Sequence, residues 1–129
     1  MTKKLKDDRM LTDTELELIS LLWKLGEGSV NDVLEQLPKE RDLAYTSVST
    51  ILRILEQKKF LKTRKEGRGH IYIPLLQKED YEERTVRHVV EHVFDGTPMA
   101  LAKQLLNTVT LSRDELDELK KLIEKAQKK

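Results

Sequence analysis

Apolar residues recur with the period of an α-helix through much of this chain, and the pattern is clearest between Tyr45 and Lys59. One side of that predicted helix is apolar and the other is polar. The apolar side consists of Val48, Ile51, Leu52 and Leu55, and the polar side of Thr46, Thr50, Arg53 and Gln57. Hydroxyls, amides and guanidinium groups hydrogen-bond to base edges and phosphates. The helix is therefore predicted to recognise DNA through this side, together with Tyr45, Ser47 and Ser49 near its start.

Two shorter helices are predicted before this one. The first starts at Thr12 with a capping box, in which a hydroxyl and the carboxylate of Glu15 three residues later bond to each other's backbone amides. Ser29 with Asp32 opens the second helix. A second capping box, Ser112 with Glu115, is predicted at the start of the last helix of the chain. The first helix would end before Gly26 and the second at Pro38. Their inward positions are Leu16, Ile19, Leu22 and Trp23 in the first, and Val30, Val33, Leu34 and Leu37 in the second.

The period changes after Lys59, where residues 60–65 and 70–73 alternate between apolar and polar. The turn between them contains two glycines, which is typical of a β-hairpin. Three short helices followed by a hairpin predict a winged helix-turn-helix domain over residues 11–75. The hairpin end would carry Arg64, Lys65 and Arg68, which are suited to backbone phosphates.

Residues 76–129 predict three further helices, each with an apolar stripe. About 50 residues form a marginal core alone, so the stripes are expected to pack against a second copy of the chain. A dimer of small winged helices would also suit a two-fold symmetric DNA site. The predicted dimerisation residues are Val86, Val89, Val90, Val93, Phe94, Leu101, Leu105, Leu116, Leu119, Leu122 and Ile123.

Composition narrows the class of protein. Among 129 residues, 36% are charged and there is no cysteine, which excludes disulfides and thiolate metal sites. No apolar run is long enough to cross a membrane, so a soluble cytoplasmic protein without a membrane partner is expected. The formal net charge is only +1, yet seven basic and two acidic residues lie between Arg53 and His70. Residues 1–10 are predicted to be a flexible arm. Its basic residues could touch DNA, although Asp7 and Asp8 weaken that idea: Lys3, Lys4, Lys6 and Arg9.

Several segments resemble the penicillinase repressor family, which includes repressors of β-lactamase and methicillin-resistance genes and copper-responsive repressors. They are Leu11-Thr-Asp-Thr-Glu-Leu-Glu with Leu22-Trp23, Tyr45-Thr-Ser-Val-Ser-Thr-Ile-Leu and Lys65-Glu-Gly-Arg-Gly-His-Ile-Tyr. Phe94-Asp-Gly-Thr and Leu111-Ser-Arg-Asp-Glu-Leu-Asp-Glu-Leu resemble the family's dimerisation region. The resemblance implies a homodimeric winged-helix repressor that binds a palindromic operator in double-stranded DNA. It also implies that Thr46, Ser47 and Thr50 occupy the places of the family's recognition-helix threonines.

The chain departs from the family pattern in the recognition helix. The family usually has arginine where Ile54 stands, whereas Arg53 lies one residue earlier and about 100° further round the helix. The family usually ends this helix with glycine at the position of Lys59. Therefore either Lys59 must adopt a left-handed conformation, at a cost of roughly 1 kcal/mol, or the helix must end differently.

Two further departures concern induction. Antibiotic-responsive members are inactivated by proteolysis at an Asn–Phe bond, and the equivalent candidate bond here is Gln104–Leu105. Copper-responsive members use C-terminal cysteines, which this chain lacks. The inducing signal therefore stays open, and so does the existence of an inactivating protease or another signal-dependent partner.

The segment His88-Val-Val-Glu-His92 matches the His-x-x-Glu-His pattern of one class of zinc peptidases. The chain is too short for that peptidase fold, and no third ligand or catalytic constellation is visible, so no enzyme, cofactor or metal is predicted. His88 and His92 remain a candidate metal pair. The alternative is two histidines beside a dimer contact, whose protonation below about pH 6.5 would weaken the dimer.

Each candidate DNA contact has an ordinary alternative. The hydroxyls of the recognition helix could be solvent-exposed helix residues, and the basic hairpin could be a solvated turn. Tyr45 could cover the core or touch a phosphate, and Arg53 could read a base or hold a phosphate. The rival function is a winged helix that docks on another protein. A hydroxyl-rich helix face followed by a basic hairpin favours DNA.

Overall fold

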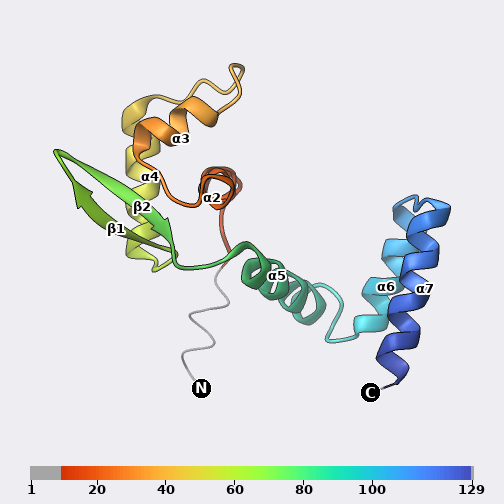
Figure 1. The fold of residues 1–129 in the computed structure, drawn as a ribbon. Coiled ribbons are helices and arrows are strands. Elements are labelled where there is room, and N and C mark those ends of the chain that lie inside the picture. The colour runs from red at the N-terminus through yellow and green to blue at the C-terminus, as the bar shows by residue number, and fades with distance from the viewer. Residues whose placement is uncertain (1–9, 129) are drawn as a thin grey trace. The chain divides into compact units, whose positions relative to one another are not determined.

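The computed structural model describes residues 10–128, which form six helices and a two-stranded antiparallel sheet (Figure 1). The elements are α2 (Asp13–Leu25), α3 (Val30–Gln36), α4 (Tyr45–Gln57), β1 (Leu61–Glu66), β2 (Gly69–Pro74), α5 (Lys78–His92), α6 (Pro98–Thr108) and α7 (Arg113–Gln127). The predicted fold class, mainly α-helical with a β-hairpin, is confirmed. None of these helices is long and apolar enough to span a membrane. Residues 1–9, most of the predicted arm, lie outside the described range.

The chain divides into two units, and the boundary between them along the sequence falls within α5. The first unit ends at Val86 and the second begins at Arg87. The first unit contains α2, α3, α4, the hairpin and the start of α5, whose Tyr81 is buried. The second contains the rest of α5 with α6 and α7. The domain limits expected from the sequence, 11–75 and 76–129, stay a prediction.

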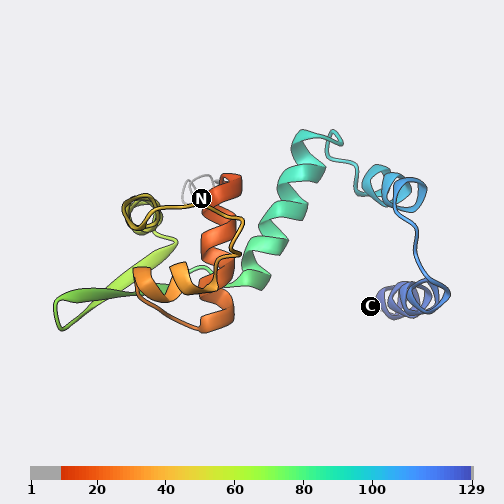
Figure 2. The same ribbon diagram turned by 90° about the horizontal axis from the view of Figure 1, so that it is seen from above.

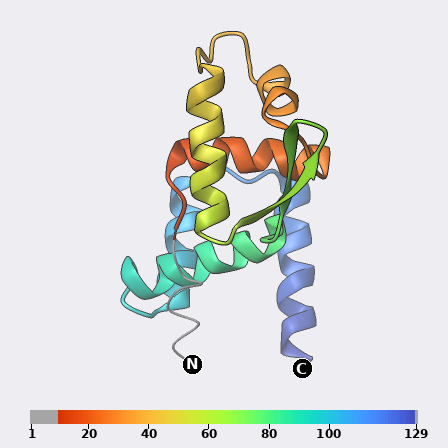
Figure 3. The same cartoon turned by 90° about the vertical axis from the view of Figure 1, so that its left-hand side faces the viewer.

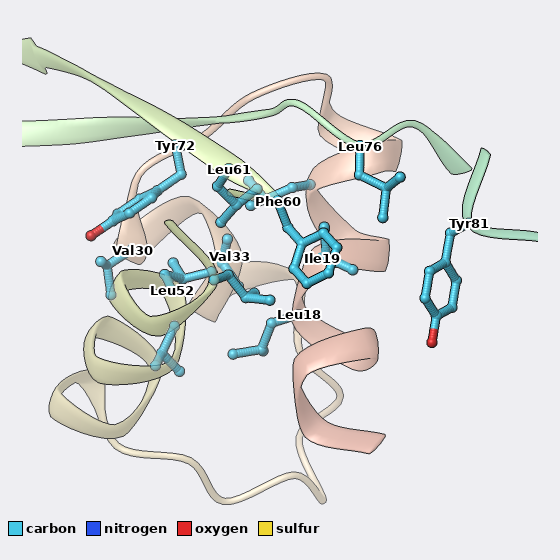
Figure 4. Close-up of a cluster of buried hydrophobic side chains, with 13 residues drawn as sticks. Leu18, Ile19, Val30, Val33, Leu52, Phe60, Leu61, Tyr72, Leu76 and Tyr81 are labelled. Atoms are coloured by element: carbon cyan, nitrogen blue, oxygen red, sulfur yellow. The ribbon is translucent and has the colours of Figure 1, made fainter. Parts of the chain in front are cut away.

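The first unit is built around an aliphatic core on which α2, α3, α4 and the hairpin converge (Figure 4). Helix α4 crosses α2 steeply, as the two turned views show (Figures 2 and 3). Each helix therefore presents one face to the shared core. Seven of its side chains have no exposed surface: Leu18, Ile19, Leu22, Val33, Val48, Leu52 and Leu55.

The buried face of α2 differs slightly from the predicted stripe. Leu18 is fully buried although it was not predicted inward, whereas Leu16 and Trp23 are only half-buried. Trp23 lies at the edge of the core, where its Nε1 donates a hydrogen bond of 2.8 Å to the carbonyl of Leu76. An indole at an edge can bury its ring and still satisfy its polar N–H group.

The helix starts predicted at Thr12, Ser29 and Ser112 are confirmed by hydrogen bonds. Thr12, Ser29 and Ser112 each form a complete capping box with the acidic residue three positions later. Thr97 is the N-cap of α6 and is followed by Pro98 at the first helical position, but its side chain makes no cap hydrogen bond. Local sequence signals therefore fixed where these helices begin.

The hairpin has a two-residue turn, because Glu66 pairs with Gly69 across the strands. Gly67 has φ +61°, which matches the positive φ that a type II′ turn needs at its first central position. A third segment joins the pair at Gly28, which exchanges backbone hydrogen bonds of 2.7 and 3.1 Å with Tyr72. These bonds fix the hairpin to the segment after α2.

In the second unit, α6 and α7 run in opposite directions (Figure 1). No side chain of either helix is buried. The chain turns after α5 through Asp95 and Gly96, which have φ of 53° and 79°. The apolar stripes of these helices thus form no closed core within one copy of the chain.

Candidate nucleic-acid interface

The outer side of α4 is open to solvent while its inner side is closed. Val48, Leu52 and Leu55 have no exposed surface, so α4 cannot rotate without disrupting the core. The candidate DNA contacts on the exposed side are Tyr45, Thr46, Ser47, Thr50, Arg53 and Gln57. Ser49 is the exception, since it is half-buried. The fold thus presents hydroxyl, amide and guanidinium groups on one fixed helix.

The N-terminus of α4 differs from those of α2, α3 and α7. Its N-cap is Ala44, and no side chain caps the helix start. The first amide groups of a helix lack intrahelical acceptors and lie at the positive end of the helix dipole. A phosphate is a good partner for such uncapped amides.

A polar groove of about 190 Å³ lies beside this helix start. It joins the beginnings of α3 and α4 to the hairpin, and its polar lining includes Ser29, Asn31, Tyr45, Ser49, Arg68, His70 and Tyr72. Burial, and secondarily the charge of Glu56, raises the pKa of Tyr72. Its hydroxyl thus stays protonated at neutral pH and remains a hydrogen-bond donor. Sequence reasoning missed Asn31 and His70 because only the tertiary fold brings them to Ser49.

The basic residues of the hairpin divide into two groups. Lys65 and Arg68 are exposed at the hairpin tip, and no ion pair engages them within residues 10–128. Arg64 instead binds Glu27 through two hydrogen bonds of 2.8 and 3.3 Å, with Glu66 at 3.6 Å. The hydrogen bonds from Arg64 lower the pKa of Glu27, and Glu27 in turn raises the pKa of Arg64. Arg64 is therefore occupied by protein carboxylates, unlike the two tip residues.

A part-buried ion pair connects α2 to the end of α4. Nζ of Lys58 donates to Oε2 of Glu15 at 2.7 Å, and the other carboxylate oxygen accepts from the Thr12 amide at 2.9 Å. Burial disfavours the Glu15 carboxylate, but the bonds from Lys58 and Thr12 outweigh it, so its pKa is lowered. This pair fixes the end of α4 against the helix that supports it.

Lys59 stands where the family usually has glycine, and it adopts a left-handed conformation with φ 73°. The first of the two alternatives expected from the sequence is therefore the observed one. The amide of Lys59 donates to the Glu56 carbonyl and that of Phe60 to the Leu55 carbonyl, both at 3.0 Å. This is the Schellman motif, with Lys59 in the place that glycine usually takes. Ile54, which stands where the family usually has arginine, is 37% exposed.

The candidate dimerisation residues are largely accessible in a single chain. Val86, Val93, Leu105, Leu116, Leu122 and Ile123 are exposed, and the partly buried members are Val89, Val90, Phe94, Leu101 and Leu119. The candidate cleavage bond Gln104–Leu105 lies inside α6. Cleavage there would first require local unfolding of that helix. His88 and His92 lie together on α5, but no cluster of three or more metal-ligating side chains occurs within residues 10–128.

The helices, the uncapped start of α4 and the basic hairpin tip together define a winged-helix DNA-binding protein. Residues 11–125 match the sequence model of the penicillinase repressor family, and the chain belongs to that family. It is therefore a transcriptional repressor and not an enzyme.

Individual relatives agree with this assignment. The chain is 29% identical over 114 residues to the penicillinase repressor of Bacillus licheniformis, covering 88% of this chain and 89% of the relative. It is 24% identical to the methicillin resistance regulatory protein MecI of Mammaliicoccus sciuri, covering 89% of this chain and 94% of the relative. Among solved structures, the DNA-binding domain of the repressor BlaI superposes with a TM-score of 0.50 at 32% identity, over 56% of this chain and 88% of that domain.

Proposed function

We propose that this protein represses transcription as a homodimer that binds a palindromic operator. In each copy, α4 enters the major groove with its exposed side, and the hairpin tip contacts backbone phosphate. The observation that carries this proposal is the contrast between the two sides of α4. Val48, Leu52 and Leu55 on its inner side are fully buried, whereas its outer side presents Thr46, Thr50, Arg53 and Gln57.

Arg53 is the most informative residue on that side. It is exposed, and no ion pair within the described residues engages it. Its guanidinium is thus available to read a base edge or to hold a phosphate. The two roles differ in their consequences, because a base contact affects sequence discrimination and a phosphate contact affects all sequences alike.

The proposal of a homodimer is supported by the second unit. Helices α6 and α7 bury no side chain in a single copy, although both carry regular apolar stripes. Leu122 and Ile123 on α7 are 57% and 51% exposed. A second copy would cover such stripes and would also place two recognition helices on one DNA site.

The DNA-binding proposal is tested with Arg53→Ala on duplexes from the protein's own promoter region. We expect the free energy of operator binding to weaken by about 1–3 kcal/mol. The slope of log affinity against log salt concentration, the salt slope, separates the two roles. A base contact would leave the salt slope unchanged and reduce discrimination, whereas a phosphate contact would flatten the slope. Lys121→Ala is the matched control, since it removes one positive charge from α7 on the side opposite its stripe.

Operator binding by Arg53→Ala that equals that of the parent would contradict both roles of Arg53. Failure of the parent to shift any promoter duplex at low salt would favour the rival protein-docking function. The dimer is tested separately, by sedimentation of Leu122→Glu with Ile123→Glu. We expect this variant to be monomeric, while Lys121→Glu, on the other side of the same helix, stays dimeric.

A further inference from the structure

His88 and His92 lie one turn apart in the second half of α5. Their rings stack with centroids 4.2 Å apart and planes inclined by 26°. Nδ1 of His92 lies 3.0 Å from the backbone oxygen of His88. A carbonyl oxygen only accepts hydrogen bonds, so Nδ1 carries the proton of the neutral ring and Nε2 keeps its free lone pair. Histidines that bind metal commonly donate their other N–H group to a carbonyl in this way.

We propose that His88 and His92 together bind one divalent ion of the late first transition row, such as Ni²⁺ or Cu²⁺. Side chains at i and i+4 share a helix face, so both imidazoles can reach one ion once a ring rotates out of the stack, because the nitrogen lone pairs lie in the ring planes. Imidazole suits Zn²⁺, Cu²⁺ and Ni²⁺, whereas Mg²⁺ and Ca²⁺ require oxygen ligands. His92 is exposed and His88 is half-buried, which leaves the remaining coordination positions to water.

The site differs from a zinc-peptidase centre, although the sequence motif is similar. Glu91 lies about 60° round the helix from His88, on the side away from His92. Within the described residues no third histidine or carboxylate completes a cluster with the pair. The protein thus supplies two ligands, and the ion would be held by α5 without being positioned for catalysis.

An ion bound to both rings links adjacent turns of α5. It binds the folded helix better than the unfolded chain, in which the two rings are not held together. Binding should therefore raise thermal stability by mass action. Both histidines lie in the part of α5 that belongs to the second unit, so the ion would stiffen that part of the helix.

The test is calorimetric titration of Ni²⁺ into the full chain at about pH 7.5, where free histidine is mostly neutral. The variants are His88→Ala and His92→Ala, and the controls are His70→Ala on the hairpin and Glu91→Gln beside the pair. We expect each pair variant to lose at least about tenfold in affinity, which corresponds to about 1.4 kcal/mol. The controls should bind as the parent does.

Alanine favours helix, so the variants should keep their helical circular dichroism. Ni²⁺ should raise the Tm of the parent and both controls but of neither pair variant, and Mg²⁺ should raise none. Parent-like Ni²⁺ affinity in His88→Ala or His92→Ala would overturn the proposal. An equal loss in His70→Ala would also overturn it, because binding would then depend on the hairpin.

Discussion

Replacing Lys59 with glycine should stabilise the first unit, although it removes a side chain. Lys59 holds φ 73° directly after the C-cap of α4, where a residue with a Cβ atom pays about 1–2 kcal/mol relative to the ordinary helical region. Glycine avoids that strain but loses more freedom on folding, by about 0.5–1 kcal/mol. The Lys59 side chain is exposed and joins no ion pair within residues 10–128, so little else changes. The net expectation is a gain of about 0.5–1 kcal/mol.

Urea unfolding followed by Trp23 fluorescence measures this gain, because Trp23 is the sole tryptophan and packs in the first unit. For a unit of this size, 1 kcal/mol corresponds to a shift in Tm of about 4–8 °C. Lys59→Ala keeps the strained φ and should give no comparable gain. Gln57→Gly, two residues earlier in regular helix, should instead lose about 1 kcal/mol. Destabilisation by Lys59→Gly as large as that of Gln57→Gly would refute the reasoning.

Two further predictions concern ion pairs. Glu15→Gln should destabilise the first unit at neutral pH. Because the folded pKa of Glu15 is lowered, this loss of stability is full above the ordinary glutamate pKa of 4.5 and narrows as pH falls through the folded pKa. Urea unfolding at several pH values checks this, and a difference that widens in acid would contradict it. Glu27→Gln should tighten DNA binding by releasing Arg64 from its carboxylate partner. A titration in the Arg64→Ala background is the control, since an equal gain there would show that Arg64 is not involved.

The sequence predicted the elements of this fold well because their signals are local. A capping box involves residues three positions apart, and the inward face of α4 follows from helical period alone. The inclusion of Leu18 in the core was missed, since periodicity shows which residues share a face but not how wide the contact is. Leu18 is buried because α2 contacts both other helices and the hairpin, which widens its inner face.

The candidate interface was predictable only in part. The exposed hydroxyls of α4 could be read from the sequence, but the pairing of Arg64 with Glu27 joins residues 37 positions apart. No local pattern reveals such a pair, so Arg64 looked equivalent to Lys65 and Arg68. The groove beside Ser49 was missed for the same reason, because its lining comes from three separate elements.

The low net charge of the chain is compatible with DNA binding once the pairing of its charges is considered. Glu15 neutralises Lys58, and Glu17 holds Arg41 with contacts of 2.9 and 3.0 Å. These four charges connect α2 to the end of α4 and to the loop that precedes it, and so help to fix the orientation of α4. The electrostatic potential at the exposed side of α4 and at the hairpin tip therefore depends on the cations that remain unpaired, chiefly Arg53, Lys65 and Arg68. The salt dependence of operator binding should follow these few residues and not the total number of basic side chains.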